Sequence, residues 1–378
     1  MNLRERKNQP GQKKILALDG GGILGLISIE ILARIEALLR ERHGRPDLVL
    51  ADYFDFVAGT STGAVISSLV SIGMSIDQIR RFYIDCGPQM FDRAFLLERL
   101  TYEYNSEPLA KKLQETFGSE REGDASSGLA TLGTDRLRTL LMVVTRNVTT
   151  DSPWPITNNP DAKYNARERP DCNLMLPLWQ VVRASTAAPS YFPSEVVDVG
   201  PRRFVFVDGG VTTYNNPTFL AFVTATTGPY NINWTAGERD MLVVSVGTGD
   251  CAREQPDITP ARMNLLYIAK NTPGALMNAA SAGQDMLCRT FGNCLCGDPI
   301  DREIGDLIGA AGPASPRLFT YMRYNADVSR AGLDALGLPE VQPSHVQLLD
   351  SIKYIDEIRQ VGEAAGRLKV KAEHFAGF

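Results

Sequence analysis

Five short apolar runs are spread along the first 250 residues, and most of them end at glycine or aspartate. The runs lie at residues 15–18, 53–58, 140–145, 204–207 and 241–246. Apolar runs of this length, of which only 53–58 contains a charged residue, Asp55, are typical of strands that are covered on both faces. Between the first two runs, leucine and isoleucine recur at helical spacing. Strands that alternate with helices predict an α/β fold with a largely parallel sheet.

The composition is that of a folded protein that does not bind a nucleic acid polymer. Of 378 residues, 44% are hydrophobic and 22% are charged, and the net charge is −5. The longest uncharged run, residues 56–76, is rich in Gly, Ser and Thr, so we interpret it as strand, turn and helix rather than a membrane span. No secretory signal begins the chain, and we therefore expect a cytoplasmic protein with reduced thiols.

The chain is predicted to have three parts. Residues 1–13 are expected to be a flexible polar arm, and residues 14–250 form the α/β domain. Residues 251–378 are expected to be a mostly helical extension that packs on this domain, with helices at 260–287 and 344–370. Such an extension could regulate the domain or form a surface between copies in a homo-oligomer.

The sequence Gly59-Thr-Ser-Thr-Gly63 follows the second apolar run and precedes a helical segment. It matches G-x-S-x-G, the pattern of a sharp strand-to-helix turn that presents a serine at the edge of a sheet. The glycines remove side chains that would collide in such a turn. The helix N-terminus also favours the negative charge that develops in acyl transfer. The pattern predicts Ser61 as a nucleophile.

A nucleophilic serine needs a base, and an aspartate fits better than a histidine. None of the three histidines follows a predicted strand: these are His43, His345 and His374. Asp208 ends the fourth run, directly before Gly209-Gly210. A carboxylate can accept the serine proton if burial raises its pKa toward neutrality. We therefore predict Asp208 as the base, in preference to a Ser-His-Asp triad.

The glycine loop Gly20-Gly21-Gly22 follows the first run and offers backbone amides for an oxyanion. Extended to Gly25, the same loop fits G-x-G-x-x-G, the dinucleotide-binding fingerprint. That fingerprint also requires an acidic residue at the end of the second strand, where this chain has the serine turn. We therefore favour an oxyanion hole.

Three motifs in this order resemble the patatin-like phospholipase family: Asp19-Gly-Gly-Gly22, Gly59–Gly63 and Asp208-Gly209-Gly210. Further segments that look like the same family lie at residues 183–192, 215–217 and 245–249. The similarity covers roughly residues 14–250. It implies a sheet sandwiched between helices, and phospholipase A-type hydrolysis of membrane phospholipids through a Ser–Asp dyad, without a metal or another cofactor.

By this resemblance Ser61 would be the nucleophile and Asp208 the base. The oxyanion hole would be formed by Gly20, Gly21 and Gly22. Leu24 stands where members often carry Arg or Lys, which puts in doubt any help from a charge there, although the backbone donors remain. The resemblance also implies a protein that is peripheral to the inner membrane when active. A general carboxylesterase or thioesterase, or a non-catalytic lipid-binding protein of the same fold, remain alternatives.

Some bacterial members of this family act in antiphage defence as phospholipases that cyclic nucleotides switch on. The resemblance thus implies a cyclic di- or trinucleotide as an activator. Four residues of the extension could supply charge and stacking for such a ligand: Arg289, Tyr321, Arg323 and Tyr324. Ordinary packing of the extension is the alternative.

Two further features concern thiols and lipid contact. Cys288, Cys294 and Cys296 lack zinc-site spacing, so reduced thiols are favoured over a metal or disulfide role. The segment 90–100 and the loop Trp154-Pro155-Ile156 carry apolar side chains that could contact a lipid surface, with ordinary packing as the favoured interpretation.

Overall fold

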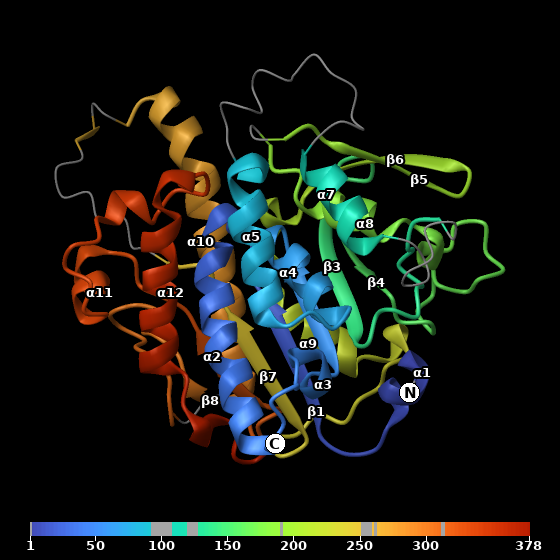
Figure 1. Cartoon of the computed structure of the whole chain (residues 1–378), viewed down its shortest axis with the longest axis horizontal. Coiled ribbons are helices and arrows are strands. Elements are labelled where there is room, and N and C mark those ends of the chain that lie inside the picture. Colours follow the sequence, from blue (N-terminus) through green and yellow to red (C-terminus); the bar gives the residue numbers. More distant parts are fainter. Residues whose placement is uncertain are drawn as a thin grey trace.

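The protein is built around one nine-stranded sheet. The computed structural model describes residues 2–91, 108–118, 128–189, 192–250, 259–260, 263–310 and 314–378. The strand order is β5-β6-β3-β2-β1-β7-β9-β8, and β4 pairs with β3 outside this order (Figure 1). The strands are β1 (Lys13–Leu18), β2 (Phe56–Thr60), β3 (Leu140–Asn147), β4 (Ser152–Thr157), β5 (Glu195–Val199), β6 (Arg202–Asp208), β7 (Met241–Val246), β8 (Asn293–Cys296) and β9 (Thr320–Tyr324).

The sheet is mixed, with a large parallel part. The six consecutive strands β3, β2, β1, β7, β9 and β8 run parallel to one another. Strands β4 and β6 pair with β3 in the antiparallel sense, and β5 pairs in the same sense with β6. Four of the five apolar runs lie within strands, and the run 53–58 enters β2 at Phe56 after Tyr53 has ended α3, so the predicted α/β fold is confirmed.

Helices cover both faces of the sheet, because alternate residues of the central strands face opposite ways. Leu16 and Leu18 of β1 belong to one core, whereas Ile15 and Ala17 belong to the other. The first core packs against α2, α4, α5, α8 and α12, and the second against α9 and part of α10 (Figure 1). The described α-helices are α1 (Leu3–Asn8), α2 (Gly25–His43), α3 (Leu50–Tyr53), α4 (Thr62–Ser71), α5 (Ile76–Phe91), α7 (Pro108–Phe117), α8 (Leu178–Ser185), α9 (Thr218–Thr226), α10 (Leu265–Phe291), α11 (Arg330–Ala335) and α12 (Ile355–Lys369).

The N-terminal residues differ from the flexible arm that the sequence predicts. Residues 3–8 form α1, which begins at an Asn2–Glu5 capping box. Lys7 is buried, forms an ion pair with Asp161, and its carbonyl accepts a hydrogen bond from Trp234 Nε1 at 2.9 Å. Both partners are more than 150 residues away in the sequence and hold α1 against the rest of the protein. The polar sequence of residues 1–13 does not indicate such distant partners.

The C-terminal part is more than a helical extension, because it completes the sheet. Strand β9 pairs with β7 from Leu242↔Thr320 to Val246↔Tyr324, and β8 pairs with β9. The predicted helices at 260–287 and 344–370 correspond to α10 and to α12 with the short turns before it. The Gly/Pro-rich sequence between them obscured two short strands.

Of the two segments for which lipid contact was the alternative to ordinary packing, one packs internally, as favoured, and the other is mostly outside the described residues. Trp154 lies on β4, where its ring centroid is 5.0 Å from that of Phe204 and 5.4 Å from that of Phe206. Residues 92–100 of the other segment are not described. Among the described helices, none is both long and apolar enough to cross a bilayer.

Helix α12 packs so closely against α2 that the contact requires a glycine, Gly362, on α12. A Cβ at Gly362 would be 2.8 Å from the carbonyl oxygen of Ile27 and 2.8 Å from Glu30 Cβ. One turn later, a Cβ at Gly366 would be 3.3 Å from Arg34 Cβ, where a small shift suffices. The C-terminal helix thus packs on the helix that follows the glycine loop.

Replacing Gly362 by Leu is expected to lower the free energy of unfolding by about 1–3 kcal/mol, because the side chain would force α12 away from α2. The matched control is Gly366→Ala, which we expect to be tolerated since alanine favours helix. Urea unfolding followed by circular dichroism measures both. Equal stability of G362L and the unaltered protein would contradict the close contact of the two helices.

Candidate active site

Ser61 lies at the sharp turn between β2 and α4, with backbone angles that few non-glycine residues adopt. Its φ is 54° and its ψ is −124°. The surrounding backbone leaves no room for a side chain at either glycine of the motif. A Cβ at Gly59 would lie 2.1 Å from the carbonyl oxygen of Gly63, and one at Gly63 would lie 2.2 Å from that of Leu18. The two glycines of the motif are therefore required by close backbone approach.

A second serine, which the sequence analysis gave no role, holds the turn in place. The Ser61 amide donates to Ser185 Oγ at 2.9 Å, and Ser185 Oγ donates to the carbonyl oxygen of Val144 at 2.6 Å. Ser185 ends α8 and is fully buried. The strained turn is thus tied to the end of β3 through one hydroxyl group.

Asp208 meets the serine from the end of β6. Ser61 Oγ donates to Asp208 Oδ2 at 2.6 Å, and the Gly210 amide donates to the other carboxylate oxygen at 2.7 Å. The register of β6 on β3 places Asp208 opposite Thr145, next to β2 and its serine turn. The carboxylate is buried, and its two oxygens have different partners.

The surroundings of Asp208 make it a stronger base than an ordinary aspartate. Burial raises the pKa of Asp208 to about 6, while the hydrogen bonds from Ser61 and Gly210 and the charge of Arg183 oppose that rise. At neutral pH such a group is mostly ionised yet can accept a proton in a transition state. The arrangement can therefore deprotonate a serine without a histidine.

The histidines lie elsewhere, each with a partner of its own. His345 Nδ1 is 2.9 Å from Glu357 Oε2, and His374 Nδ1 is 2.8 Å from Tyr324 Oη. The His43 ring lies against Tyr53, with centroids 5.9 Å apart.

The glycine loop comes to the same place as Ser61. A Cβ on Gly20 would lie 3.1 Å from Ser61 Cβ. The Gly20 amide already donates to the carbonyl oxygen of Asn215 at 3.1 Å, so it is not free for an oxyanion. Among the described residues, the amides of Gly21 and Gly22 have no such acceptor. The structure thus narrows the predicted donors from three to two.

A cavity of about 710 Å³ opens beside this loop. Gly20 and Gly21 line it, Leu24 and Thr248 lie near them, and residues 271–282 of α10 supply much of the wall. Residues 271–284 carry no charged side chain. An uncharged helix face next to candidate oxyanion donors could accommodate an apolar chain.

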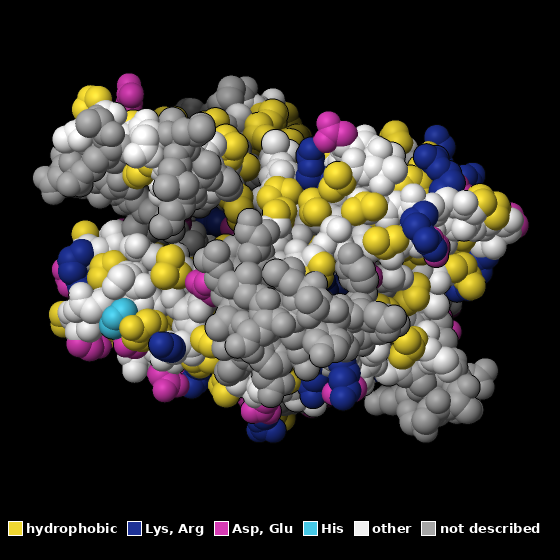
Figure 2. Space-filling model, turned by 90° about the horizontal axis from the view of Figure 1, so that it is seen from above, with side chains coloured by type: hydrophobic (Ala, Val, Ile, Leu, Met, Phe, Trp, Pro, Cys, Tyr) yellow, Lys and Arg dark blue, Asp and Glu magenta, His cyan; other side chains and the backbone are white. Residues whose placement is uncertain are grey.

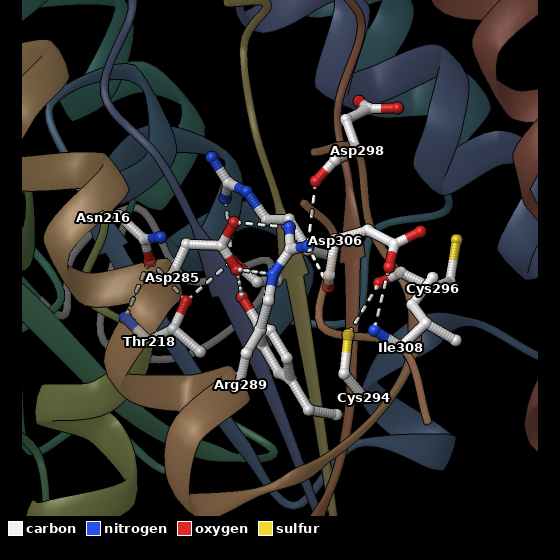
Figure 3. A network of polar contacts seen from close by, with 12 residues as sticks. Asn216, Thr218, Asp285, Arg289, Cys294, Cys296, Asp298, Asp306 and Ile308 are labelled. Carbon is white, nitrogen blue, oxygen red and sulfur yellow. Dashed lines mark hydrogen bonds and ion pairs between the residues drawn. The ribbon is translucent and has the colours of Figure 1, made fainter. Parts of the chain in front are cut away.

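The four residues predicted to bind a nucleotide have structural partners instead. Tyr321 and Tyr324 are fully buried, so neither ring is available to stack on a ligand. Arg289 forms an ion pair with Asp285 and donates to the carbonyl oxygens of Asp298 and Asp306 (Figure 3). A buried strand of polar and aromatic residues resembles a binding segment in sequence, which explains why the two tyrosines of β9 were included.

Arg323 is likewise buried, in an ion pair with Asp19, the residue before the glycine loop.

The described cysteines are free thiols, and Cys294 Sγ lies 3.6 Å from the carbonyl oxygen of Cys296. In the described ranges no group of three or more His, Cys, Asp or Glu residues is arranged to hold a metal ion.

Comparisons with known proteins agree with this geometry. The family model of the patatin-like phospholipases matches residues 16–222. Patatin-like protein 1 of Oryza sativa subsp. indica is 34% identical over 242 residues, which cover 59% of this chain and 53% of that protein. A protein of Escherichia coli (strain TW11681) named cGAMP-activated phospholipase is 28% identical over 243 residues, or 62% of each chain.

A protein of the same name from Vibrio cholerae serotype O1 is 28% identical over 309 residues, which cover 77% of this chain and 81% of that protein. The chain thus spans less than two thirds of the first two relatives and four fifths of the third. The matched segment contains the glycine loop, Ser61 and Asp208 and makes up more than half of the residues. The chain therefore belongs to the patatin-like phospholipase family.

Proposed function

We propose that this protein is a phospholipase A-type acyl hydrolase, with Ser61 as nucleophile and Asp208 as general base. The observation that carries the proposal is the 2.6 Å hydrogen bond from Ser61 Oγ to the buried Asp208 carboxylate. The hydrogen bond forms at a turn in which Ser61 adopts a strained backbone conformation. Nucleophilic serines commonly lie at such turns. The raised pKa of Asp208 supports the role of base.

In the first step, Asp208 accepts the Ser61 proton while Oγ attacks the acyl carbonyl carbon. The amides of Gly21 and Gly22 are the donors for the resulting oxyanion. The intermediate collapses, Asp208 returns the proton to the leaving alcohol oxygen, and a lysophospholipid departs. The fatty acyl group remains as an ester on Ser61.

In the second step, water hydrolyses that ester. Asp208 takes a proton from the water as its oxygen attacks the acyl carbon, and the same two amides hold the oxyanion. Collapse returns the proton to Ser61 Oγ and releases the fatty acid. The dyad is thereby restored, and protons and bonds balance without a metal or cofactor.

Phospholipid is the proposed substrate rather than a small soluble ester or thioester. The uncharged α10 wall beside the glycine loop could accommodate an acyl chain. Large apolar side chains are exposed nearby, including Leu276, which is 65% exposed, and Met263, which is 49% exposed. Figure 2 shows apolar side chains among polar and charged ones over the described part of the upper face. Such a face favours contact with a lipid surface, so we propose peripheral binding to the inner membrane.

A cyclic nucleotide activator in antiphage defence is a further part of the proposal. The support is that two relatives are named cGAMP-activated phospholipases. The residues that would bind the activator are left open, because Arg289, Tyr321 and Tyr324 have other partners.

Ser61→Ala and Asp208→Asn are each expected to lower fatty acid release from mixed phospholipid vesicles by about 10⁴-fold or more, because each removes one half of the dyad. Release is measured with and without cGAMP. Asp198→Asn is the matched control, since Asp198 is an exposed aspartate paired with Arg203. Release that persists in S61A would contradict the proposal. Release only from short esters or thioesters would favour the esterase alternative, and none at all would favour a lipid-binding protein.

The pH dependence follows from the base. Because the pKa of Asp208 is raised to about 6, kcat/KM should fall about tenfold per pH unit below pH 6 and level off above it. A pH–rate profile between pH 4.5 and 8.5 on vesicles of fixed composition measures this. A profile that stays nearly flat down to pH 4.5 would indicate an ordinary carboxylate and contradict the assignment.

The same pKa has a consequence for stability. A raised pKa in the folded state means that ionising Asp208 opposes folding, by about 3 kcal/mol above pH 6, and that this cost disappears as pH falls toward 4. Asp208→Asn should therefore unfold at a temperature equal to or above that of the unaltered protein at pH 7.5. Thermal unfolding tests it, and a large loss of stability would show that the carboxylate contributes to folding.

A further inference from the structure

We propose that Arg323 on β9 is a positioning residue that holds the glycine loop, and with it the amides of Gly21 and Gly22, in place for the oxyanion. This inference rests on the proposed acyl transfer at Ser61. It adds a residue that lies outside the matched segment 16–222. The catalytic unit of this chain would then include its C-terminal part.

The first observation is a two-pronged ion pair at the start of the loop. Arg323 Nη1 donates to Asp19 Oδ1 at 2.9 Å, and Nη2 donates to Oδ2 at 2.5 Å. The side chains are only 7% and 5% exposed. A planar guanidinium fixes the orientation of a carboxylate as well as its charge. Asp19 directly precedes Gly20, so the position of the loop is set from β9.

The second observation is an independent contact from Asn325, the residue that follows β9. Asn325 Oδ1 accepts a hydrogen bond from the Gly249 amide at 2.8 Å. The neighbouring Thr248 donates from Oγ1 to the carbonyl oxygen of Gly20 at 3.0 Å. A Cβ on Gly21 would lie 2.2 Å from that Oγ1. The end of β9 thus supports the glycine loop by two routes.

The guanidinium also reaches the segment that follows Asp208. Arg323 Nη1 donates to Ser245 Oγ at 2.8 Å, and Thr218 Oγ1 is 2.7 Å from the same oxygen. Thr218 is in turn hydrogen-bonded to Asn216 (Figure 3). One buried arginine therefore connects the loop with the chain beyond the base.

Misplacement of this loop would affect the chemical step more than substrate binding. Oxyanion donors act on charge that develops in the transition state, and losing one typically costs about 10²–10³-fold in kcat. A shift of about 1 Å in positioning groups can cost about 10²-fold. A purely structural arginine would instead change stability and leave kcat per folded molecule unaltered.

The chain contains a matched control for a buried Arg–Asp pair. Arg289 Nε and Nη2 donate to Asp285 at 3.0 and 2.6 Å, and the side chains are 1% and 12% exposed (Figure 3). Both residues of this pair lie in α10, and among the described residues neither hydrogen-bonds to the glycine loop. Arg289→Lys removes a two-pronged contact with a buried aspartate, as Arg323→Lys does, but in a pair without a described hydrogen bond to the glycine loop.

The experiment measures kcat and KM for fatty acid release from vesicles, together with the unfolding temperature, for R323K, R323Q, the double variant D19N/R323Q and the control R289K. We expect kcat to fall about 10²-fold in R323K and further in R323Q, with KM changed less than about twofold. R289K should keep its kcat within about twofold. The double variant should be no slower than R323Q, because the two residues act as one unit.

Wild-type kcat in R323K would overturn the inference, as would an equal loss of kcat in R289K. If R323K or R323Q does not fold, the double variant, in which both buried charges are absent, decides: wild-type kcat there overturns the inference, and a 10²-fold loss supports it. Absence of Ser61-dependent release in the unaltered protein would overturn the proposed function and this inference together. That outcome is seen before any Arg323 variant is compared.

Discussion

The hydrogen bond between Ser61 and Asp208 joins two segments that are more than 140 residues apart in the sequence, and it forms only if the fold places both at the same edge of the sheet. Forming it opposes folding twice, because Ser61 adopts a strained backbone and Asp208 is ionised in a buried place. Two hydrophobic cores, one on each face of the sheet, hold both residues despite this cost. The free energy of packing in these two cores therefore offsets the cost of holding Ser61 and Asp208 in a reactive arrangement at the edge of the sheet.

The C-terminal part is integral to this arrangement. Strand β9 extends the sheet beyond β7, α12 packs closely on α2, and Arg323 forms an ion pair with the residue before the glycine loop. Because burial isolates this pair from water, removing one partner would leave an uncompensated charge. The family match ends at residue 222, yet the contacts around the loop continue through residue 325 to Leu349, whose carbonyl oxygen accepts from the Ile23 amide.

Sequence predicted those features that depend on local pattern. Apolar runs located five strands, and the glycines around Ser61 and after Asp208 indicated where the chain turns at the sheet edge. Features that depend on distant partners were missed. Helix α1 is held by Trp234 and Asp161, and the prolines of β4 concealed a strand that pairs with β3 at the side of the main strand order.

The same limit explains the errors at the candidate site. Arg323 and Tyr321 lie on a strand whose polar groups are satisfied by Asp19 and Asp285, and no spacing in the sequence shows those partners. Of the three glycine amides, only the structure shows that the one of Gly20 is already bonded to Asn215.

Intact-protein mass spectrometry after incubation with a fluorophosphonate tests the central claim most directly, because the probe reacts with a serine only when it is activated. The account predicts a single adduct that peptide mapping places on Ser61, formed quickly at pH 8, slowly at pH 5 and not at all in Asp208→Asn. An adduct on another serine, or equal labelling of Ser61 in Asp208→Asn, would contradict it.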